Sequence, residues 1–389
     1  MVLKERVFQA LLSEGNPRYR REDLGEMIGQ GGFSTVYHLP GRGEGNVAVK
    51  LTKIVSGFLG IMENDGAYVP ISVAITDKGN LCYGQRKFSL SSSRPSPESG
   101  VASFSALCAA VIESLALEEL NSDPSLYKRI PALIRPWEFL QSAADLYVGM
   151  ELEYFPRSHS LARYLFQLKT STVPINPDEL GKNDPPHNVV PLSFPENLSL
   201  ESILQIAVQT GKTLQYIHGH NIVHGDVKPA NVLLQYDSLQ EPHVILLDFG
   251  TARKVGEENF NRDPRFLPLV PRLSSIFSGT LLYLAPEQLQ AKLYCPETDA
   301  YQLGVLVYTL LTRKDFVEDR RERSIIRFIN GYNEASCDEK IRDVKTACPQ
   351  VPSDVLEVLR NLLDPNFLKR NLASCILVFS YYANKKKFI

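Results

Sequence analysis

Two acidic motifs in the middle of the chain, each beside an apolar run, constrain the fold most. Residues 224–231, HGDVKPAN, come directly before the apolar run 232–234. Asp248 ends a second apolar run 17 positions after Asn231 (248 − 231). A carboxylate at the end of a buried strand costs free energy unless a cation or hydrogen bonds compensate it. The pattern therefore predicts two short strands, with polar residues at their ends that can hold a cation.

The residue types in these motifs suit one kind of chemistry. Asp226 can accept a proton from an attacking hydroxyl, and Lys228 can neutralise a phosphoryl group during its transfer. Asn231 and Asp248 offer the hard oxygen ligands that magnesium prefers. A polar turn before a strand would not require Asp, Lys and Asn at these intervals.

A glycine-rich segment and a lysine precede these motifs. In residues 29–36, GQGGFSTV, glycines would let the backbone approach phosphates closely, although a glycine-rich hairpin turn alone would look the same. Lys50 follows Val36 by 14 positions (50 − 36) in the strand-like run VAVK. On a strand its side chain points to the opposite face from its neighbours. An exposed lysine on an edge strand is the alternative, but it explains the ordered pair of motifs poorly.

The order of the elements predicts a β-rich front and a helical back. Strand-like runs lie near 24–55, 133–140 and 146–153, a possible hairpin lies at 73–85, a helix at 102–120, and helices dominate from 198. Two lobes follow from this order. We divide the chain into an N-terminal extension (1–22), a first lobe (23–153) with an insertion (56–100), and a second lobe (154–389) with a loop insertion (169–197).

Two further motifs complete an ordered set of six. Residues 278–287, SGTLLYLAPE, and residues 299–304, DAYQLG, follow Asp248. Together with the four elements above, they match the signature set of protein kinases. From about residue 24 to 380, the chain resembles the eukaryotic-type Ser/Thr protein kinase superfamily. The resemblance implies an α+β fold with two lobes, a small β-rich lobe and a large α-helical lobe.

The resemblance also implies ATP and Mg2+ as cofactors and a role for each matching residue. Asp226 would be the catalytic base with Lys228 beside it, and Asn231 and Asp248 would bind magnesium. Lys50 would hold the α- and β-phosphates and pair with a helix glutamate. The expected nucleotide-binding residues are Ile28, Gly29, Gly31, Ser34, Val36, Ala48, Lys50, Glu113, the hinge residues Met150, Glu151 and Leu152, and Leu233.

Two ion pairs require a choice between candidates. Glu113 shares a helix face with Leu117 and Leu120, whereas Glu118 points well away from it, so we choose Glu113 as the partner of Lys50. Both glutamates could also be exposed helix charges. Glu287 is expected to pair with Arg370, with Lys369 as the alternative.

Three departures from the family pattern stand out. Ser34 replaces the third glycine of the loop. Gly225 replaces the arginine that receives an activation-loop phosphate in this family, which predicts activity independent of that phosphorylation. Lys50 and Glu113 lie 63 positions apart (113 − 50), so residues 56–100 form an insertion for docking, for regulation or without a role. The last two features also resemble secreted rhoptry kinases of apicomplexan parasites, although no signal peptide is recognisable.

Composition limits the partners and the compartment. The net charge of −2 gives no reason to expect nucleic acid. Six dispersed cysteines without CxxC spacing fit a reducing compartment. We find no run of about 18 apolar residues, so we expect no membrane span. The N-terminal residues make a poor secretory signal, so we expect a cytoplasmic location. Nothing in the sequence indicates an oligomeric state.

Three functions remain. Lys228 and Thr280 favour a protein kinase acting on Ser or Thr, by resemblance. A pseudokinase scaffold would be expected to lack Lys50, Asp226 or Asp248. A small-molecule kinase of the aminoglycoside-phosphotransferase kind would share the nucleotide-binding lobe, but it would lack the peptide-docking segment at 285–287.

Overall fold

The structure, a computed structural model, describes most of the chain in two compact units. The predicted extension 1–22, Gly31 and most of the predicted loop 169–197 lie outside the described residues. The first unit holds the described residues up to Asn121 and those within 132–156, and the second holds the described residues within 122–131, 157–255 and 280–384. The described residues are 24–30, 34–41, 46–54, 59–62, 68–75, 81–84, 97–141, 146–170, 198–236, 241–255, 280–291 and 293–384.

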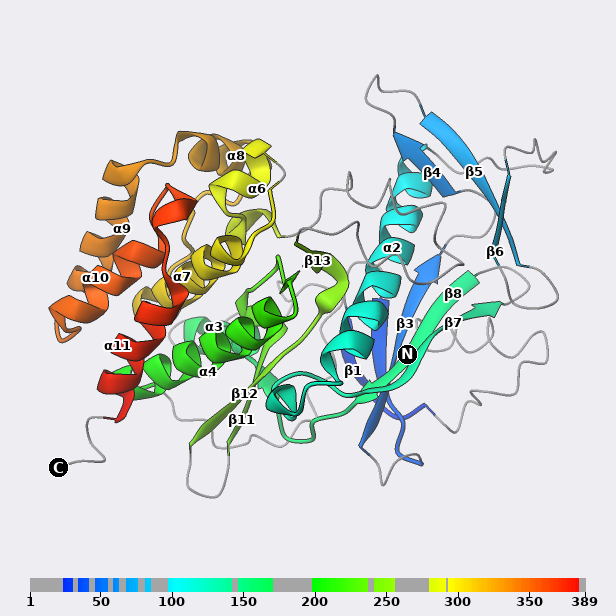
Figure 1. The fold of residues 1–389 in the computed structure, drawn as a ribbon, viewed down its shortest axis with the longest axis horizontal. Coiled ribbons are helices and arrows are strands. Elements are labelled where there is room, and N and C mark those ends of the chain that lie inside the picture. The colour runs from blue at the N-terminus through cyan, green and yellow to red at the C-terminus, as the bar shows by residue number, and fades with distance from the viewer. Residues whose placement is uncertain are drawn as a thin grey trace. The chain divides into compact units, whose positions relative to one another are not determined.

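The first unit is built on a five-stranded antiparallel sheet of order β1-β2-β3-β8-β7 (Figure 1). Side chains alternate between the faces of its strands. In β3, Val47, Val49 and Leu51 enter a core cluster with Tyr37 and Tyr147. The alternate residues of β3, Lys50 among them, therefore face the other side. The strands are β1 (Met27–Gln30), β2 (Ser34–His38), β3 (Val47–Ile54), β7 (Leu133–Gln141) and β8 (Leu146–Glu153).

Helix α2 (Pro97–Leu120) packs against β3, β7 and β8 of this sheet. It begins five residues before the predicted start at 102 (102 − 97). Proline suits the first helical position, because the N–H that proline lacks would have no partner there. The helix ends as predicted near Asn121, whose side chain accepts the backbone N–H of Leu133.

The predicted insertion contains a small sheet of its own. Strands β4 (Leu59–Met62), β5 (Tyr68–Ile75) and β6 (Leu81–Gly84) form a three-stranded antiparallel sheet. The predicted hairpin is confirmed, since β5 and β6 pair with Ile75 opposite Leu81. The first turn of α2 falls within the range 56–100 that we assign to the insertion.

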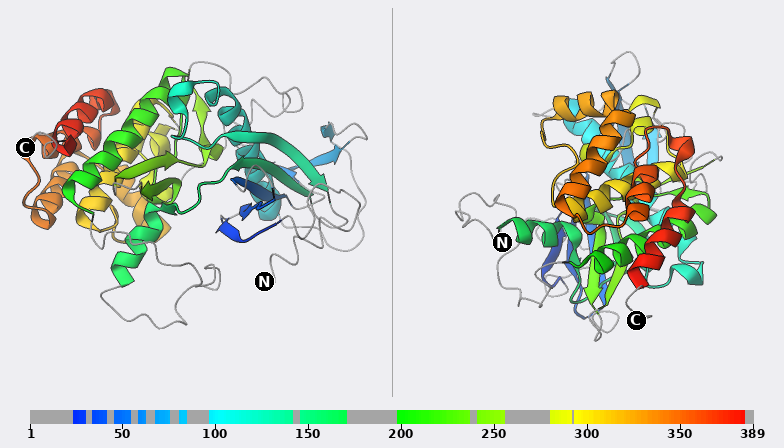
Figure 2. Two further views of the ribbon diagram at one scale, coloured as in Figure 1. Left: turned by 90° about the horizontal axis from the view of Figure 1, so that it is seen from below. Right: turned by 90° about the vertical axis from the view of Figure 1, so that its left-hand side faces the viewer.

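The second unit is helical around one buried helix, α7, whose residues from Thr298 to Thr312 are all buried. Helices α4 and α11 lie side by side (Figures 1 and 2). At Gly211 of α4, an added Cβ would lie 2.8 Å from Cγ1 of Ile376, so only glycine permits this approach. The α-helices are α3 (Leu161–Thr170), α4 (Leu200–Gly219), α6 (Pro286–Ala291), α7 (Pro296–Thr312), α8 (Glu322–Gly331), α9 (Glu334–Ala347), α10 (Ser353–Leu362) and α11 (Leu372–Asn384).

Short strands and 3-10 turns connect these helices. β11 and β12 form the predicted pair of strands, and β9 adds to them, while β10 pairs with β13. Among the described residues, no helix combines the length and apolar content needed to cross a bilayer. The short elements are β9 (His159–Ser160), β10 (Ile222–Val223), β11 (Val232–Tyr236), β12 (Pro242–Leu246), β13 (Arg253–Lys254), and the turns η3 (Pro124–Leu126), η5 (Pro229–Asn231), η6 (Phe249–Thr251), η7 (Leu281–Tyr283) and η8 (Phe367–Lys369).

Candidate active site

The backbone of the segment 224–227 is held by two buried side chains of α7. The carboxylate of Asp299 accepts the backbone N–H of His224 at 2.9 Å and that of Gly225 at 2.7 Å. One helical turn later, Gln302 accepts the backbone N–H of Val227 at 2.8 Å. Both side chains are fully buried, so their hydrogen bonds are made without competition from water. These bonds fix the shape of the segment that carries Asp226.

Asp226 is the centre of a polar cluster in the second unit. Its Oδ1 accepts the backbone N–H of Thr280 at 2.9 Å, and its Oδ2 accepts Nζ of Lys228 at 2.5 Å. The Asn231 side chain donates to Oδ2 of Asp226 at 3.2 Å and to its carbonyl oxygen at 2.9 Å. Nζ of Lys228 also donates to Oγ1 of Thr280 at 2.5 Å. The structure thus brings Asp226, Lys228 and Asn231 together.

The strand pair β11–β12 places Asn231 and Asp248 at one end of a hairpin. Val232 pairs with Leu246, and the N–H of Leu247 donates to the carbonyl of Asn231 at 2.8 Å. Asp248 follows with a left-handed backbone (φ 65), which aspartate tolerates better than most residues. Both Asn231 side-chain bonds to Asp226 use its amide nitrogen, which leaves the amide oxygen directed elsewhere.

This donor set fits magnesium shared with a phosphate ligand. Magnesium is typically bound by one or two carboxylates together with water and substrate phosphates. Asn231 and Asp248 offer such oxygen ligands. Within the described part of the chain, no group of three His, Cys, Asp or Glu side chains could hold a metal ion by itself.

In the first unit, Lys50 forms an ion pair with Glu113 of α2. Nζ of Lys50 lies 2.6 Å from Oε2 of Glu113, and Glu113 is only 3% exposed. Glu118 is exposed, so the structure chooses between the two candidates as we predict. Lys50 stands opposite Val36 on one neighbouring strand and opposite Met150 on the other. These three residues therefore lie in one row across the sheet.

The predicted hinge residues Met150, Glu151 and Leu152 lie within β8, between its neighbours β3 and β7. The side chain of Glu151 is buried and pairs with Arg135 at 3.5 Å. The N–H of Glu153 donates to the carbonyl of Ala132 at 2.8 Å. The N–H of Glu153 is therefore bonded within the first unit, and β8 ends at Glu153, the last residue of the predicted strand-like run.

The other predicted nucleotide-binding residues within the described part of the chain lie on β1, β2, β3 and β11. Gly29 pairs with Val36 across β1 and β2. Ala48 is buried in β3, on the same face as Lys50, and stands opposite Leu152. Half-buried positions in β1, β2 and β11 are taken by Ile28, Ser34 and Leu233.

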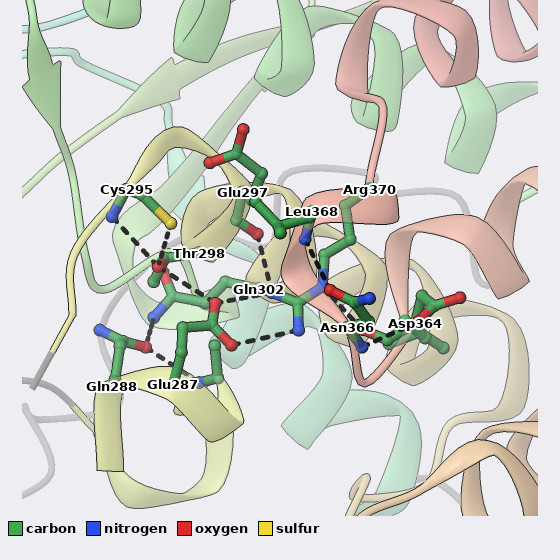
Figure 3. A network of polar contacts seen from close by, with 12 residues as sticks. Glu287, Gln288, Cys295, Glu297, Thr298, Gln302, Asp364, Asn366, Leu368 and Arg370 are labelled. Atoms are coloured by element: carbon green, nitrogen blue, oxygen red, sulfur yellow. Dashed lines mark hydrogen bonds and ion pairs between the residues drawn. The ribbon is translucent and has the colours of Figure 1, made fainter. Parts of the chain in front are cut away.

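Glu287 and Arg370 form a buried bidentate ion pair (Figure 3). Nη1 of Arg370 lies 2.6 Å from Oε1 of Glu287, and Nη2 lies 3.1 Å from Oε2. The guanidinium also stacks over the ring of Tyr301 at 4.7 Å. Lys369 instead pairs with Glu334 at the surface, so the first choice of partner is confirmed.

Several residues that shape the site escape the sequence analysis. Gln302 and Gln288 both donate to the carbonyl oxygen of Gly225, at 2.9 and 3.1 Å. The sequence offered one signal, for Gln302 alone: it lies three positions after Asp299 and so on the same face of the helix. Burial raises the pKa of Tyr283 to about 12 and the pKa of Cys295 to about 11, so both groups stay neutral at physiological pH.

Comparison with known proteins gives one family match and several relatives. The family described as "Protein kinase domain" matches residues 127–381. A protein kinase and PP2C-like domain-containing protein of Arabidopsis thaliana is 39% identical over 32% of the chain and 19% of that protein. A probable serine/threonine-protein kinase of Dictyostelium discoideum is 28% identical over 46% of the chain and 29% of its own length. For mouse serine/threonine-protein kinase D3, the values are 31%, 46% and 17%. The matched region thus spans less than a third of each of these relatives.

Proposed function

The chain belongs to the protein kinase family, and from this premise we propose that it transfers the γ-phosphate of ATP to Ser or Thr hydroxyls of protein substrates. The observation that carries the proposal is the cluster around Asp226. A buried carboxylate with a lysine, an amide and a backbone N–H on its oxygens suits a base that works beside a transferring phosphoryl group.

The proposed step exchanges one P–O bond for another and moves one proton. The substrate oxygen bonds to the γ-phosphorus while the bond from that phosphorus to the β,γ-bridging oxygen breaks, and ADP leaves. The proton of the hydroxyl passes to the carboxylate of Asp226. Lys228 balances negative charge on the phosphoryl group, and Thr280 keeps Lys228 and Asp226 in place through its two hydrogen bonds.

Asn231 and Asp248 would hold Mg2+, which supplies positive charge to the phosphate oxygens. Lys50 would bind the α- and β-phosphates, and Glu113 orients it through their 2.6 Å ion pair. Val36, Ala48 and Leu233 offer apolar surface for adenine. The loop residues Ile28, Gly29, Gly31 and Ser34, with Met150, Glu151 and Leu152, complete the proposed nucleotide site.

Phosphate transfer from γ-labelled ATP to a library of Ser, Thr and Tyr peptides tests this function. We expect labelled Ser or Thr peptides, and we expect Lys50→Met to lower kcat by about 10²- to 10³-fold, as the loss of one preorganised charged donor does. Lys53→Met is the matched control, because Lys53 is an exposed lysine of the same strand; its kcat should stay within about twofold of wild type.

The alternatives give different results in the same assay. ATP binding without transfer to any peptide would identify a scaffold. Transfer to aminoglycosides but not to peptides would identify a small-molecule kinase. Labelling confined to Tyr peptides would contradict the proposed hydroxyl specificity.

We further propose that activity does not require phosphorylation of the activation loop. Gly225 offers no guanidinium to a loop phosphate. Alanine replacement of Ser274, Ser275 and Ser278, which lie outside the described residues, should each change kcat by less than about twofold. Phosphatase treatment should have as little effect. A large loss at any of the three serines would reject the proposal, whereas Thr280→Ala should lower kcat because Thr280 contacts Asp226 and Lys228 directly.

A further inference from the structure

The position of Gly225 beside an aromatic ring is the starting point, and the inference rests on the proposed kinase activity. The backbone of Gly225 has φ +78, a left-handed conformation that favours glycine. A Cβ at this position would lie 3.2 Å from the ring carbons Cδ1 and Cε1 of Tyr294 and 3.2 Å from the carbonyl oxygen of Thr251. The ring of Tyr294 therefore occupies the space into which a longer side chain at position 225 would extend.

Tyr294 also contacts the cation that follows the Asp248 motif. The guanidinium of Arg253 lies over the Tyr294 ring at 5.2 Å from its centroid. Nη1 of Arg253 donates to the carbonyl oxygens of Thr251 and Ala252 at 3.2 and 2.9 Å. Arg253 is only 8% exposed, so this cation–π contact is largely shielded from water and is strong for its kind.

The backbone around Arg253 is fastened to the segment that carries Asp226. Val223 pairs with Arg253 between β10 and β13. Oγ1 of Thr251 donates to the carbonyl oxygen of His224 at 2.7 Å. A displacement of residues 251–254 would therefore disturb both the turn after Asp248 and residues 223–224, which precede Asp226.

We propose that Tyr294 is a positioning residue. It covers Gly225 and stacks on Arg253, and it thereby holds residues 251–254 against the catalytic segment 224–227. The arrangement uses a side chain of the chain itself, in the space left by a glycine, to keep an arginine in place. This role explains why position 225 is glycine, because the Tyr294 ring and a longer side chain at position 225 would exclude each other sterically. Activation then needs no phosphate at this point.

Two substitutions at position 294 distinguish the contribution of the aromatic face from that of apolar contact alone. Tyr294→Phe keeps the aromatic face and should retain kcat within twofold. Tyr294→Leu keeps apolar contact with Gly225 but loses the π face. It should lower kcat by roughly five- to thirtyfold, the range that corresponds to a cation–π contact shielded from water, with KM for ATP changed less than twofold. Equal activity of the Leu and Phe variants, or an equal loss in both, would overturn the proposal.

Hydrogen exchange gives a readout that does not depend on kinase activity. In Tyr294→Leu, the backbone amides of β10 and β13 should exchange faster than in Tyr294→Phe, while those of α7 should be unchanged. Arg253→Met should also speed exchange in β10 and β13, and by more than Tyr294→Leu, because it removes two hydrogen bonds as well as the cation–π contact. The double variant should be no worse than Arg253→Met alone. Additive effects or unchanged exchange would overturn the proposal. An inactive wild type would reject the proposed function alone, because the exchange comparison still decides the role of Tyr294.

Discussion

Asp226→Asn is expected to lower kcat by about 10²- to 10⁴-fold, the usual contribution of a positioned general base, at temperatures where the variant is folded. Asn keeps the size of Asp and offers an oxygen to the N–H of Thr280, which Asp226 accepts at 2.9 Å, but its amide nitrogen then faces the donors of Lys228 and Asn231. It cannot take the hydroxyl proton, and it no longer balances the charge of Lys228. Steady-state transfer of labelled phosphate to the best peptide of the library, with the melting temperature measured in parallel, checks this expectation.

The control for this substitution is Asp338→Asn. Asp338 also pairs with a cation, Arg360 at 2.8 Å, but its side chain is 44% exposed and its ion pair is on the surface. We expect its kcat to stay within about twofold of the wild-type value. A variant Asp226→Asn with more than about a tenth of wild-type kcat would mean that another group removes the proton.

Arg370→Met is expected to lower the free energy of unfolding by about 3–5 kcal/mol, because it leaves the carboxylate of Glu287 buried without its partner charge. Both side chains of the pair are almost fully buried, at 0% and 5% exposure. Thr298 donates one further bond to Glu287 at 3.2 Å, which cannot replace an ion pair with two hydrogen bonds. Urea denaturation followed by circular dichroism measures the change.

Lys369→Met is the matched control, since it removes a lysine at the adjacent position. The side chain of Lys369 is 54% exposed and its pair with Glu334 spans 3.5 Å, so the expected loss is within about 0.5 kcal/mol. The double variant Glu287→Met/Arg370→Met should recover part of the loss, because no lone charge remains buried. A loss below about 1 kcal/mol in Arg370→Met would contradict this view of the pair.

The motifs predicted the family and the fold class, and both are confirmed. The chemistry of Asp226, Lys228 and Asn231 is local, so their spacing predicted that they could act together, and the structure places them within hydrogen-bonding reach. The choice of Glu113 for Lys50 also needed only local information, because helical periodicity decides which glutamate shares a face with buried Leu117. The individual nucleotide-binding roles, the compartment and the lack of a nucleic-acid partner remain predictions.

The bounds of β8 agree with the predicted run at 146–153, but the sequence could not show which backbone groups of this strand are bonded. Residues 150–153 alternate in the same way in a strand and in an extended connection. Their state depends on distant partners: the N–H of Glu153 bonds to Ala132, and the N–H of Tyr154 bonds to Asn46. No local pattern records such bonds. The same reason hid the contact of Tyr294 with Arg253 and Gly225, whose three positions are far apart in the chain.

Anchoring of the segment 224–227 on α7 has a consequence for how the enzyme would lose activity. Asp299 and Gln302 hold this segment from within the most deeply buried helix of the second unit. Regions open locally at low free energy when their hydrogen bonds are exposed and their apolar contacts are few, and neither condition holds here. The catalytic segment 224–227 should therefore unfold together with the helical core of the second unit, and heat should expose its backbone amides to exchange in the same transition that unfolds α7.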